Sequence, residues 1–231
     1  SNDDDVQSDA LKNWMLQSLS LNNIMNESSD LRDRIICEEI PSSQRWLSDI
    51  MAAMRDGKKL EVTHQSFWRD EPHTFTMAPY CVKLFKQRWY LTGLSDGYTE
   101  LRTYALDRIH HIYQAKQNFA LPKGFDPKDT FRKLFGVILD NGPVEKVVIR
   151  VSDEQVKYYR TLPLHHSQEE VGSGEGYVDF SYSLVPTYDF SRELLSKGDS
   201  VEVLSPAWLR REIALELRRA VSMYGDVKGD E

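Results

Sequence analysis

The chain has 231 residues, a formal net charge of -7 at pH 7 and a pI near 5.4. This length allows one large or two small domains with a sizeable core, and the acidic balance argues against a protein that coats nucleic acid non-specifically. With only Cys37 and Cys81, no disulfide framework is expected, so both are predicted to be reduced thiols in a cytoplasmic protein. The acidic N-terminus is unlike a signal peptide, and no apolar run approaches the ~20 residues of a membrane-spanning helix.

Two helices are predicted in the first quarter of the chain. The first covers residues 9 to about 19, where apolar side chains recur every four positions. The second shows a serine cap, an apolar stripe and a closing glycine in the expected order, namely Ser42 or Ser43, then Trp46, Ile50 and Met54, then Gly57. These stripes could pack on the following domain or on a second subunit, and the sequence leaves both open.

Five or six short strand candidates follow within residues 60–113, the first with alternating apolar and polar residues and the others rich in aromatic and β-branched residues. They cover residues 60–64, 74–77, 80–85, 88–94 and 101–106. Breakers such as Ala78-Pro79 and Lys86-Gln87 separate them. Many short strands with tight turns in so short a span predict a small β-barrel.

Beyond the linker-like residues 121–124 and a turn at 141–143, the pattern changes. We expect a strand at 146–151, a helix at 153–162, a hairpin from 165–170 and 177–185, a helix at 190–195 and a strand at 200–204. This order is similar to a ferredoxin-like module. The last helix has the clearest signals, which are Ser205 as cap, Pro206 in the first turn, Leu209, Ile213, Leu217 and Val221 as a stripe, and Gly225 beyond its end.

The most informative residues are two pairs of arginine and tyrosine in neighbouring strand candidates. Because residues i and i+2 share a strand face, Arg88 with Tyr90, and Arg102 with Tyr104, each place a guanidinium beside an aromatic ring. Arginine binds phosphate through two hydrogen bonds and stacks on bases, while tyrosine offers a ring face. This pairing favours nucleic acid or a nucleotide as the ligand.

The same region carries a resemblance to a known family. Trp89-Tyr90-Leu91, Arg102-x-Tyr104 and Leu106-Asp107-Arg108-Ile109 resemble the signature of the WYL domain, and residues 144 to about 224 are similar to the WCX domain that commonly follows it. The resemblance implies an Sm-like, SH3-type small β-barrel that senses nucleic-acid or nucleotide effectors in bacterial transcriptional regulators.

Regulators of this kind usually carry a winged helix-turn-helix domain before the WYL domain, and nothing in this sequence looks like one. The chain also begins at Ser1 without an initiator methionine. We therefore expect the sensor half of a longer regulator, whose operator-binding part is absent. The predicted fold is α+β, with a helical linker or dimerisation segment at 1–58, a WYL Sm-like β-barrel at 59–120, a linker at 121–143 and a WCX-like α+β domain at 144–225.

Arg102 and Arg108 are the leading candidates for ligand contact. From the residues alone, surface salt bridges to Asp107 or Glu100 explain both arginines equally well, and the family resemblance favours the ligand. Supporting candidates are Arg88, Tyr104 and Ser66, with His64 and Lys83 as weaker ones. For His64 and Ser66 the competing interpretation is a solvated strand face, and for Tyr104 a core position with a bonded hydroxyl.

The leading hypothesis is a ligand-sensing and oligomerisation part of a bacterial transcriptional regulator, and the alternative is a ligand-free interaction or dimerisation module. A homodimer is expected, because such regulators commonly match two half-sites of operator DNA. No cofactor, metal or enzymatic activity is expected. The doublets His110-His111 and His165-His166 lack metal-site spacing, and the Gly-rich run 172–176 precedes no helix. The effector, the target genes and the direction of regulation stay open.

Overall fold

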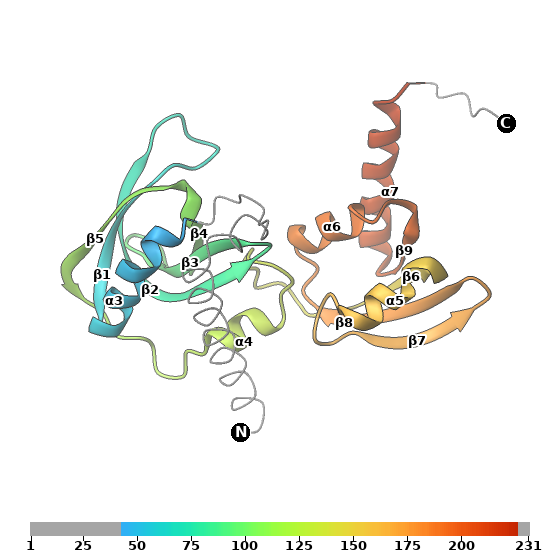
Figure 1. Ribbon diagram of the computed structural model, residues 1–231, viewed down its shortest axis with the longest axis horizontal. Helices are drawn as coiled ribbons and strands as arrows, with labels where there is room; N and C mark the ends of the chain where they lie inside the picture. The colour runs from blue at the N-terminus through green and yellow to red at the C-terminus, as the bar shows by residue number, and fades with distance from the viewer. Residues whose placement is uncertain (1–42, 226–231) are drawn as a thin grey trace, which may run out of the picture. The chain divides into compact units, whose positions relative to one another are not determined.

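The computed structural model describes residues 43–225 and confirms the mixed α+β class, with two antiparallel sheets (Figure 1). The helix predicted at 9–19, and with it Cys37 and Ser42, lies outside the described residues. The elements of the first half are η1 (Gln44–Trp46), α3 (Leu47–Asp56), β1 (Lys58–His64), β2 (His73–Phe85), β3 (Arg88–Ser95), β4 (Arg102–Ala105), η2 (Leu106–Arg108) and β5 (Ile109–Asn118). Those of the second half are α4 (Pro127–Arg132), β6 (Glu145–Ser152), α5 (Asp153–Thr161), β7 (Glu169–Gly174), β8 (Tyr177–Leu184), α6 (Tyr188–Leu195), η3 (Gly198–Ser200), β9 (Val201–Ser205) and α7 (Ala207–Ser222).

The first sheet has five strands in the order β4-β3-β2-β1-β5. Every neighbouring pair is antiparallel. Strands β4 and β5 form the two edges, and the hydrogen bonding among residues 43–225 does not close the sheet into a barrel. The single turn of η2 connects these two edge strands, so the residues of η2 lie next to the ends of both.

Strand β2 differs from the sequence prediction, which placed two strands there with a break at Ala78-Pro79. The structure has one continuous strand of 13 residues. Pro79 pairs with Gly93, and the register shifts between Pro79 and Cys81, so the missing N–H of proline falls at an irregularity of the ladder. Gly93 lacks the side chain that would collide with the Ala78 carbonyl oxygen, which allows this close approach of the two strands.

Helix α3 packs on this sheet through its apolar stripe. Ile50 and Ala53 are fully buried, together with core residues from β1, β2, β3 and η2 (Figure 1). Trp46 contacts the same core and donates a hydrogen bond from Nε1 to the Ile109 carbonyl, at 3.2 Å. The predicted stop at Gly57 is observed, with a left-handed φ of 60°, whereas Ser43 makes no side-chain cap. One of the two open alternatives is thus settled, since the stripe of α3 faces its own domain.

The second sheet has four antiparallel strands in the order β7-β8-β6-β9, and its core is separate from that of the first sheet. Strand β7 starts at Glu169, later than predicted, because His165 and Ser167 are held by hydrogen bonds outside the ladder. Ser205 ends β9 and does not cap α7, whose first turn follows Pro206.

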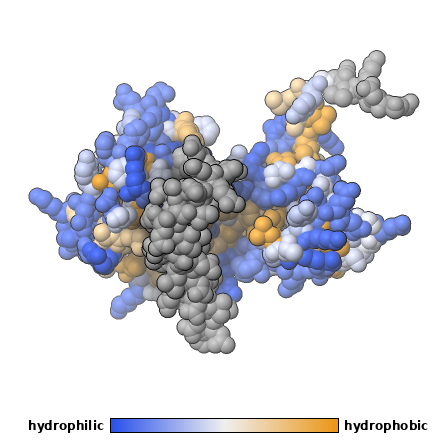
Figure 2. All heavy atoms as spheres, viewed as in Figure 1, coloured by the Kyte–Doolittle hydropathy of each residue, from blue (hydrophilic) through white to orange (hydrophobic). Residues whose placement is uncertain are grey.

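The apolar stripe of α7 is buried only in its first half. Leu209 is fully buried, whereas Val221 is 69% exposed, and hydrophobic residues are visible along this helix in Figure 2. The predicted spacing is therefore present, but the core ends before the helix does. Within the described part of the chain, no helix combines the length and apolar character needed to cross a membrane.

Candidate nucleic-acid site

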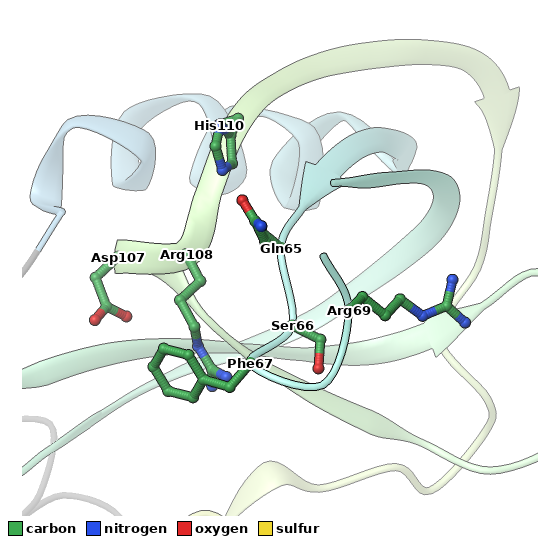
Figure 3. A pocket seen from close by; sticks show the side chains of 7 residues that line it. All are labelled: Gln65, Ser66, Phe67, Arg69, Asp107, Arg108 and His110. Atoms are coloured by element: carbon green, nitrogen blue, oxygen red, sulfur yellow. The ribbon is translucent and has the colours of Figure 1, made fainter. Parts of the chain in front are cut away.

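Two neighbouring pockets lie where the β1–β2 loop meets η2 and β4. The first, here called the Arg108 pocket, has a volume of about 350 Å³ and is lined by Gln65, Ser66, Phe67, Arg69, Asp107, Arg108 and His110 (Figure 3). The second, the Arg102 pocket, has a volume of about 280 Å³ and is lined by His64, Ser66, Arg69, His73, Phe75, Asp96, Tyr98, Arg102, Thr103 and Tyr104. Both include Ser66 and Arg69, so the pockets adjoin at the start of the loop.

Each pocket contains an arginine that stacks on an aromatic ring. The Arg108 guanidinium carbon lies 4.5 Å from the centroid of Phe67, and that of Arg102 lies 3.7 Å from the centroid of Tyr98. Figure 3 shows the Arg108 side chain beside the Phe67 ring, with Arg69 pointing away from this pair. Neither stacked arginine has a carboxylate partner among residues 43–225. Their hydrogen-bond donors are therefore open to an anionic ligand.

The two carboxylates that line the pockets are each paired with a cation that lines neither pocket. Arg88 Nη1 lies 3.7 Å from Asp107 Oδ2, and Lys59 forms an ion pair with Asp96. Asp107 Oδ1 is buried without a hydrogen-bond partner in the described chain. These pairings offset the negative charge of the walls, so that the pockets favour anions through Arg69, Arg102 and Arg108.

His64 is the last residue of β1, and its buried side chain lines the Arg102 pocket. Only 8% of the residue is exposed, and its Nε2 has no hydrogen-bond partner in the part of the chain that the structure describes. Burial and, to a smaller extent, the positive charge of Arg108 together lower the pKa of His64 to about 4, although the carboxylate of Asp107 opposes them. The imidazole is therefore neutral at pH 7, with a ring nitrogen unused by the protein itself.

Tyr104 and Ser66 differ in how free their hydroxyls are. The Tyr104 ring meets His64 edge-on, with centroids 5.3 Å apart, and its hydroxyl is 2.7 Å from Ser95 Oγ. Burial raises the pKa of this phenol, so Tyr104 brings no charge to the pocket. Its ring also packs against Phe75, with centroids 4.8 Å apart. Ser66 Oγ accepts a hydrogen bond from the Trp68 N–H at 3.3 Å, which leaves its O–H available as a donor.

The structure gathers five of the seven predicted site residues around the two pockets. Four of them, namely His64, Ser66, Arg102 and Tyr104, line the Arg102 pocket, and Arg108 with Ser66 lines the other. Arg88 lies outside both pockets and reaches them only through Asp107.

Lys83 lies elsewhere, in a contact with the second half of the chain. Its Nζ donates a hydrogen bond to the Gly136 carbonyl oxygen and sits 4.1 Å from the centroid of Phe131. Burial lowers the pKa of this amine, which the carboxylate of Asp189 partly opposes. These contacts give Lys83 a packing role away from the pockets.

Sequence reasoning missed three residues that shape the pockets, namely Phe67, Arg69 and Tyr98. Phe67 is 79% exposed in the β1–β2 loop, and Tyr98 lies in the turn before β4. The available signal was an arginine close to exposed aromatic residues within loops, in Phe67-Trp68-Arg69 and in Tyr98 to Arg102. The alternation that marks strand faces does not reveal these residues, because side chains in loops do not alternate with a period of two.

The described residues hold no group of three or more His, Cys, Asp or Glu side chains suited to a metal ion. Cys81 is buried in β2, and this burial raises the pKa of its thiol to about 11. A thiol with such a pKa is protonated at pH 7 and is a poor nucleophile.

The chain is thus an α+β protein with two adjoining pockets that contain arginine side chains. Residues 45–114 match the WYL domain and residues 143–221 match the WCX domain, so the chain contains both, in that order. The WYL match suggests a regulatory module that senses a ligand or nucleic acid. Comparison with the curated proteins gave no match.

Among solved structures, the chain is similar to proteasome accessory factor B/C (PafBC) of Arthrobacter aurescens, with 21% identity and a TM-score of 0.35 over 76% of this chain and 27% of that chain. It is also similar to a CRISPR Cas-related protein, with 13% identity and a TM-score of 0.45 over 78% of this chain and 53% of that chain. The chain thus spans about a quarter of the first protein and about half of the second.

Proposed function

We propose that this chain is the ligand-sensing and oligomerisation part of a bacterial transcriptional regulator, and that it binds a nucleic-acid or nucleotide-type effector in its WYL domain. The observation that carries the proposal is the pair of arginines, Arg102 and Arg108, each stacked on an aromatic ring and without a carboxylate partner in the described chain. A guanidinium offers five N–H donors for phosphate, and the neighbouring ring offers a face for a base. Both parts of a nucleotide thus find a matching group within one pocket.

The architecture supports this reading of the two halves. The strand order β4-β3-β2-β1-β5, with η2 between its two edge strands, fits the Sm-like module that the WYL resemblance implies. The order strand, helix, hairpin, helix, strand in the second half fits a ferredoxin-like domain. In this proposal the first sheet binds the effector, and operator DNA is bound by a separate N-terminal domain. The chain has no enzymatic step.

Effector binding regulates only if the ligand prefers one of two conformations. The turn between β2 and β3 is a candidate element for such coupling, because Lys86 Nζ lies 2.6 Å from Glu193 of α6. Phe85, at the end of β2, also contacts the core of the second sheet and meets Phe135 edge-on. Strand β2 also supplies His73 and Phe75 to the Arg102 pocket, so it contacts the pocket near one end and the core of the second sheet at the other.

A ligand-free dimerisation module is the second candidate, and the exposed half of α7 favours it. Leu217 and Val221 on this helix and Met223 just after it expose apolar surface, which a second copy of the chain could cover. We include a homodimer in the proposal, and light scattering coupled to size exclusion measures it directly. A monomer at concentrations of tens of micromolar contradicts the dimer without touching the effector site.

The proposal is tested by fluorescence anisotropy of short single-stranded DNA and RNA oligonucleotides at two salt concentrations. We expect saturable binding that weakens with salt, since phosphate contacts release counterions. The double variant Arg102→Ala/Arg108→Ala is expected to lose at least ~100-fold in affinity, because a hydrogen bond to a charged group contributes about 1.5–3 kcal/mol.

Arg160→Ala is the matched control. This arginine is exposed and paired with Glu170 at 2.6 Å, far along the chain from the pockets, so its removal should leave binding unchanged. Equal binding by wild type and the double variant would overturn the proposed site. Absence of binding to oligonucleotides and to mononucleotides alike would leave the dimerisation module as the function.

A further inference from the structure

The Arg102 and Arg108 pockets repeat the same pair of groups. Each contains one arginine stacked on one aromatic ring, Arg108 on Phe67 and Arg102 on Tyr98. Each has a volume near 300 Å³, the lower end of the ~300–1,000 Å³ typical of small-molecule pockets. One pocket therefore suits a single nucleotide unit and not a whole oligonucleotide.

The side chains that line both pockets are suited to bind the phosphate that links two nucleotides. Ser66 and Arg69 line both pockets. Within residues 43–225 the Ser66 Oγ accepts a hydrogen bond from Trp68 N–H and donates none, so its O–H can donate to a ligand. The Arg69 guanidinium has no ion-pair or side-chain hydrogen-bond partner in the described chain. A hydroxyl and a guanidinium at the junction supply donors for a phosphodiester.

The buried imidazole of His64 in the Arg102 pocket adds an independent observation. The residue is more than nine-tenths buried and lines the Arg102 pocket. It immediately precedes the β1–β2 loop, which carries Ser66 and Arg69. Its Nε2 has no partner within residues 43–225, and a buried polar atom without a partner is costly in an unliganded protein. A ligand group with hydrogen-bonding capacity at this position would satisfy it.

We propose that the site takes a linear single strand of at least two nucleotides, with one unit in the Arg108 pocket, the next in the Arg102 pocket, and the linking phosphate at Ser66 and Arg69. This inference rests on the proposed function and narrows it to a ligand class. Single-strandedness follows from the rings, because Phe67 and Tyr98 can stack only on bases that are not already stacked in a duplex.

The consequence is a threshold in ligand length. Two weakly bound units gain strongly when a linker of matching length joins them, because the second contact becomes intramolecular. A linear dinucleotide should therefore bind on the order of 100-fold more tightly than a mononucleotide, and a third nucleotide should add little. A nucleoside diphosphate carries two phosphates but only one base, so it should resemble the mononucleotide.

The experiment is isothermal titration calorimetry of the whole chain with AMP, ADP, the linear dinucleotide pApA and the trinucleotide pApApA, each in ribo and deoxyribo form. The expected result is a single large gain in affinity between the one-base ligands and the dinucleotides. Comparison of the two sugar series shows whether the source is RNA or DNA, and either preference is compatible with the shared chemistry.

Single variants test that the gain comes from joining two pockets. Arg102→Ala and Arg108→Ala should each reduce dinucleotide affinity to near the mononucleotide value, while Arg160→Ala preserves the gain. If AMP and pApA bind equally well, or ADP matches pApA, the two-pocket inference is wrong while the effector site stands. If none of the ligands binds, the proposed function itself fails.

Discussion

Arginines in the two halves of this chain sit in similar surroundings with one difference. Arg150 in β6 lies 3.6 Å from the ring centroid of Tyr177, much as Arg102 lies 3.7 Å from that of Tyr98. Arg150 also makes two hydrogen bonds to the carboxylate of Asp179, at 2.8 and 3.0 Å, whereas Arg102 has no carboxylate partner in the described chain. Stacking alone thus does not indicate a binding arginine. N–H donors without a protein partner do indicate one, because only they can donate hydrogen bonds to the oxygens of a phosphate.

The sharpest test of this comparison reverses the charge at each of the two matched arginines. Arg102→Glu should lower oligonucleotide affinity by more than ~100-fold, since it removes a donor set and adds a like charge to the ligand. Arg150→Glu should leave affinity unchanged and lower the urea midpoint of unfolding, because the new carboxylate faces Asp179. Anisotropy and urea denaturation measure the two effects, and equal losses of affinity would refute the distinction.

Removing the rings should have the next largest effect. Phe67→Ala and Tyr98→Ala are each expected to cost about 1–3 kcal/mol of oligonucleotide binding, the range measured for base stacking on aromatic side chains. Tyr177→Ala removes a ring that also stacks on an arginine, but that arginine is already paired. We therefore expect no change in affinity for this control. A loss of affinity in Tyr177→Ala would place a second ligand site on the WCX domain.

Strand periodicity and the family signature together predict, from sequence alone, five of the residues that line the two pockets. Alternation in a strand placed Arg102 and Tyr104 on one face, and both line the same pocket. The competing salt bridges from Arg102 or Arg108 to Asp107 or Glu100 do not form, since the partner of Asp107 is Arg88. Sequence spacing cannot decide between such partners, because charge pairing depends on which loop conformation brings two side chains within reach.

Loops and irregular strands account for what the sequence did not predict. The β1–β2 loop places Phe67 and Arg69 by its own turn, for example through the hydrogen bond from Arg69 N to the Ser66 carbonyl, and no period marks such positions. Ala78-Pro79 looked like a break because proline lacks a donor, yet a shift in register keeps β2 continuous. In both cases tertiary contacts, which a local pattern cannot include, override the local signal.

Substitution of Arg88 tests whether this arginine, which lines neither pocket, supports ligand binding by offsetting the negative charge of Asp107. Removing it in Arg88→Ala leaves the charge of Asp107 unopposed beside the bound phosphate, and we expect affinity to fall by about 5-fold, as for a partly screened charge at several ångströms. The second substitution in Arg88→Ala/Asp107→Asn should restore affinity to near the wild-type value. This non-additivity, measured by anisotropy, is the signature of coupling between the two residues.

Lys86→Ala provides the comparison for Arg88. Lys86 lies two residues away in the same β-hairpin but pairs with Glu193 of the second half, at 2.6 Å. Burial tends to raise the pKa of Glu193, and its hydrogen bonds with Lys197 and Lys86 outweigh this, so the pKa is lowered overall. Removing Lys86 should thus weaken the contact between the halves. Because Lys86 opposes no carboxylate of the pockets, we expect affinity to change less than in Arg88→Ala. Similar losses in both variants would mean that the hairpin acts as one unit.

The two halves also differ in a pair of buried histidines, His64 and His165. The pH dependence of affinity that we expect from this difference is the smallest of the predicted effects. Burial lowers the pKa of both His64 and His165 to about 4, with Arg108 as a further cause for His64 and His166 for His165. The ring nitrogens of His165 lie 2.8 Å from the Ser167 hydroxyl and 2.8 Å from the Arg132 carbonyl, whereas His64 Nε2 is unpartnered in the described chain. Only His64 is therefore positioned to exchange a proton in response to a ligand.

For both histidines the folded-state pKa lies below the unfolded value of about 6.5, so the unfolded chain binds more protons and stability falls as pH drops from 6.5 towards 4. Bound phosphate opposes the effect of Arg108 and His110 on His64 and raises its pKa, so oligonucleotide affinity should increase about 3-fold between pH 6.5 and 5. His64→Gln should abolish this increase, and His165→Gln should retain it while flattening the stability profile. Because phosphodiesters do not titrate in this range, a pH-independent affinity in the wild type would mean that His64 does not contact the ligand.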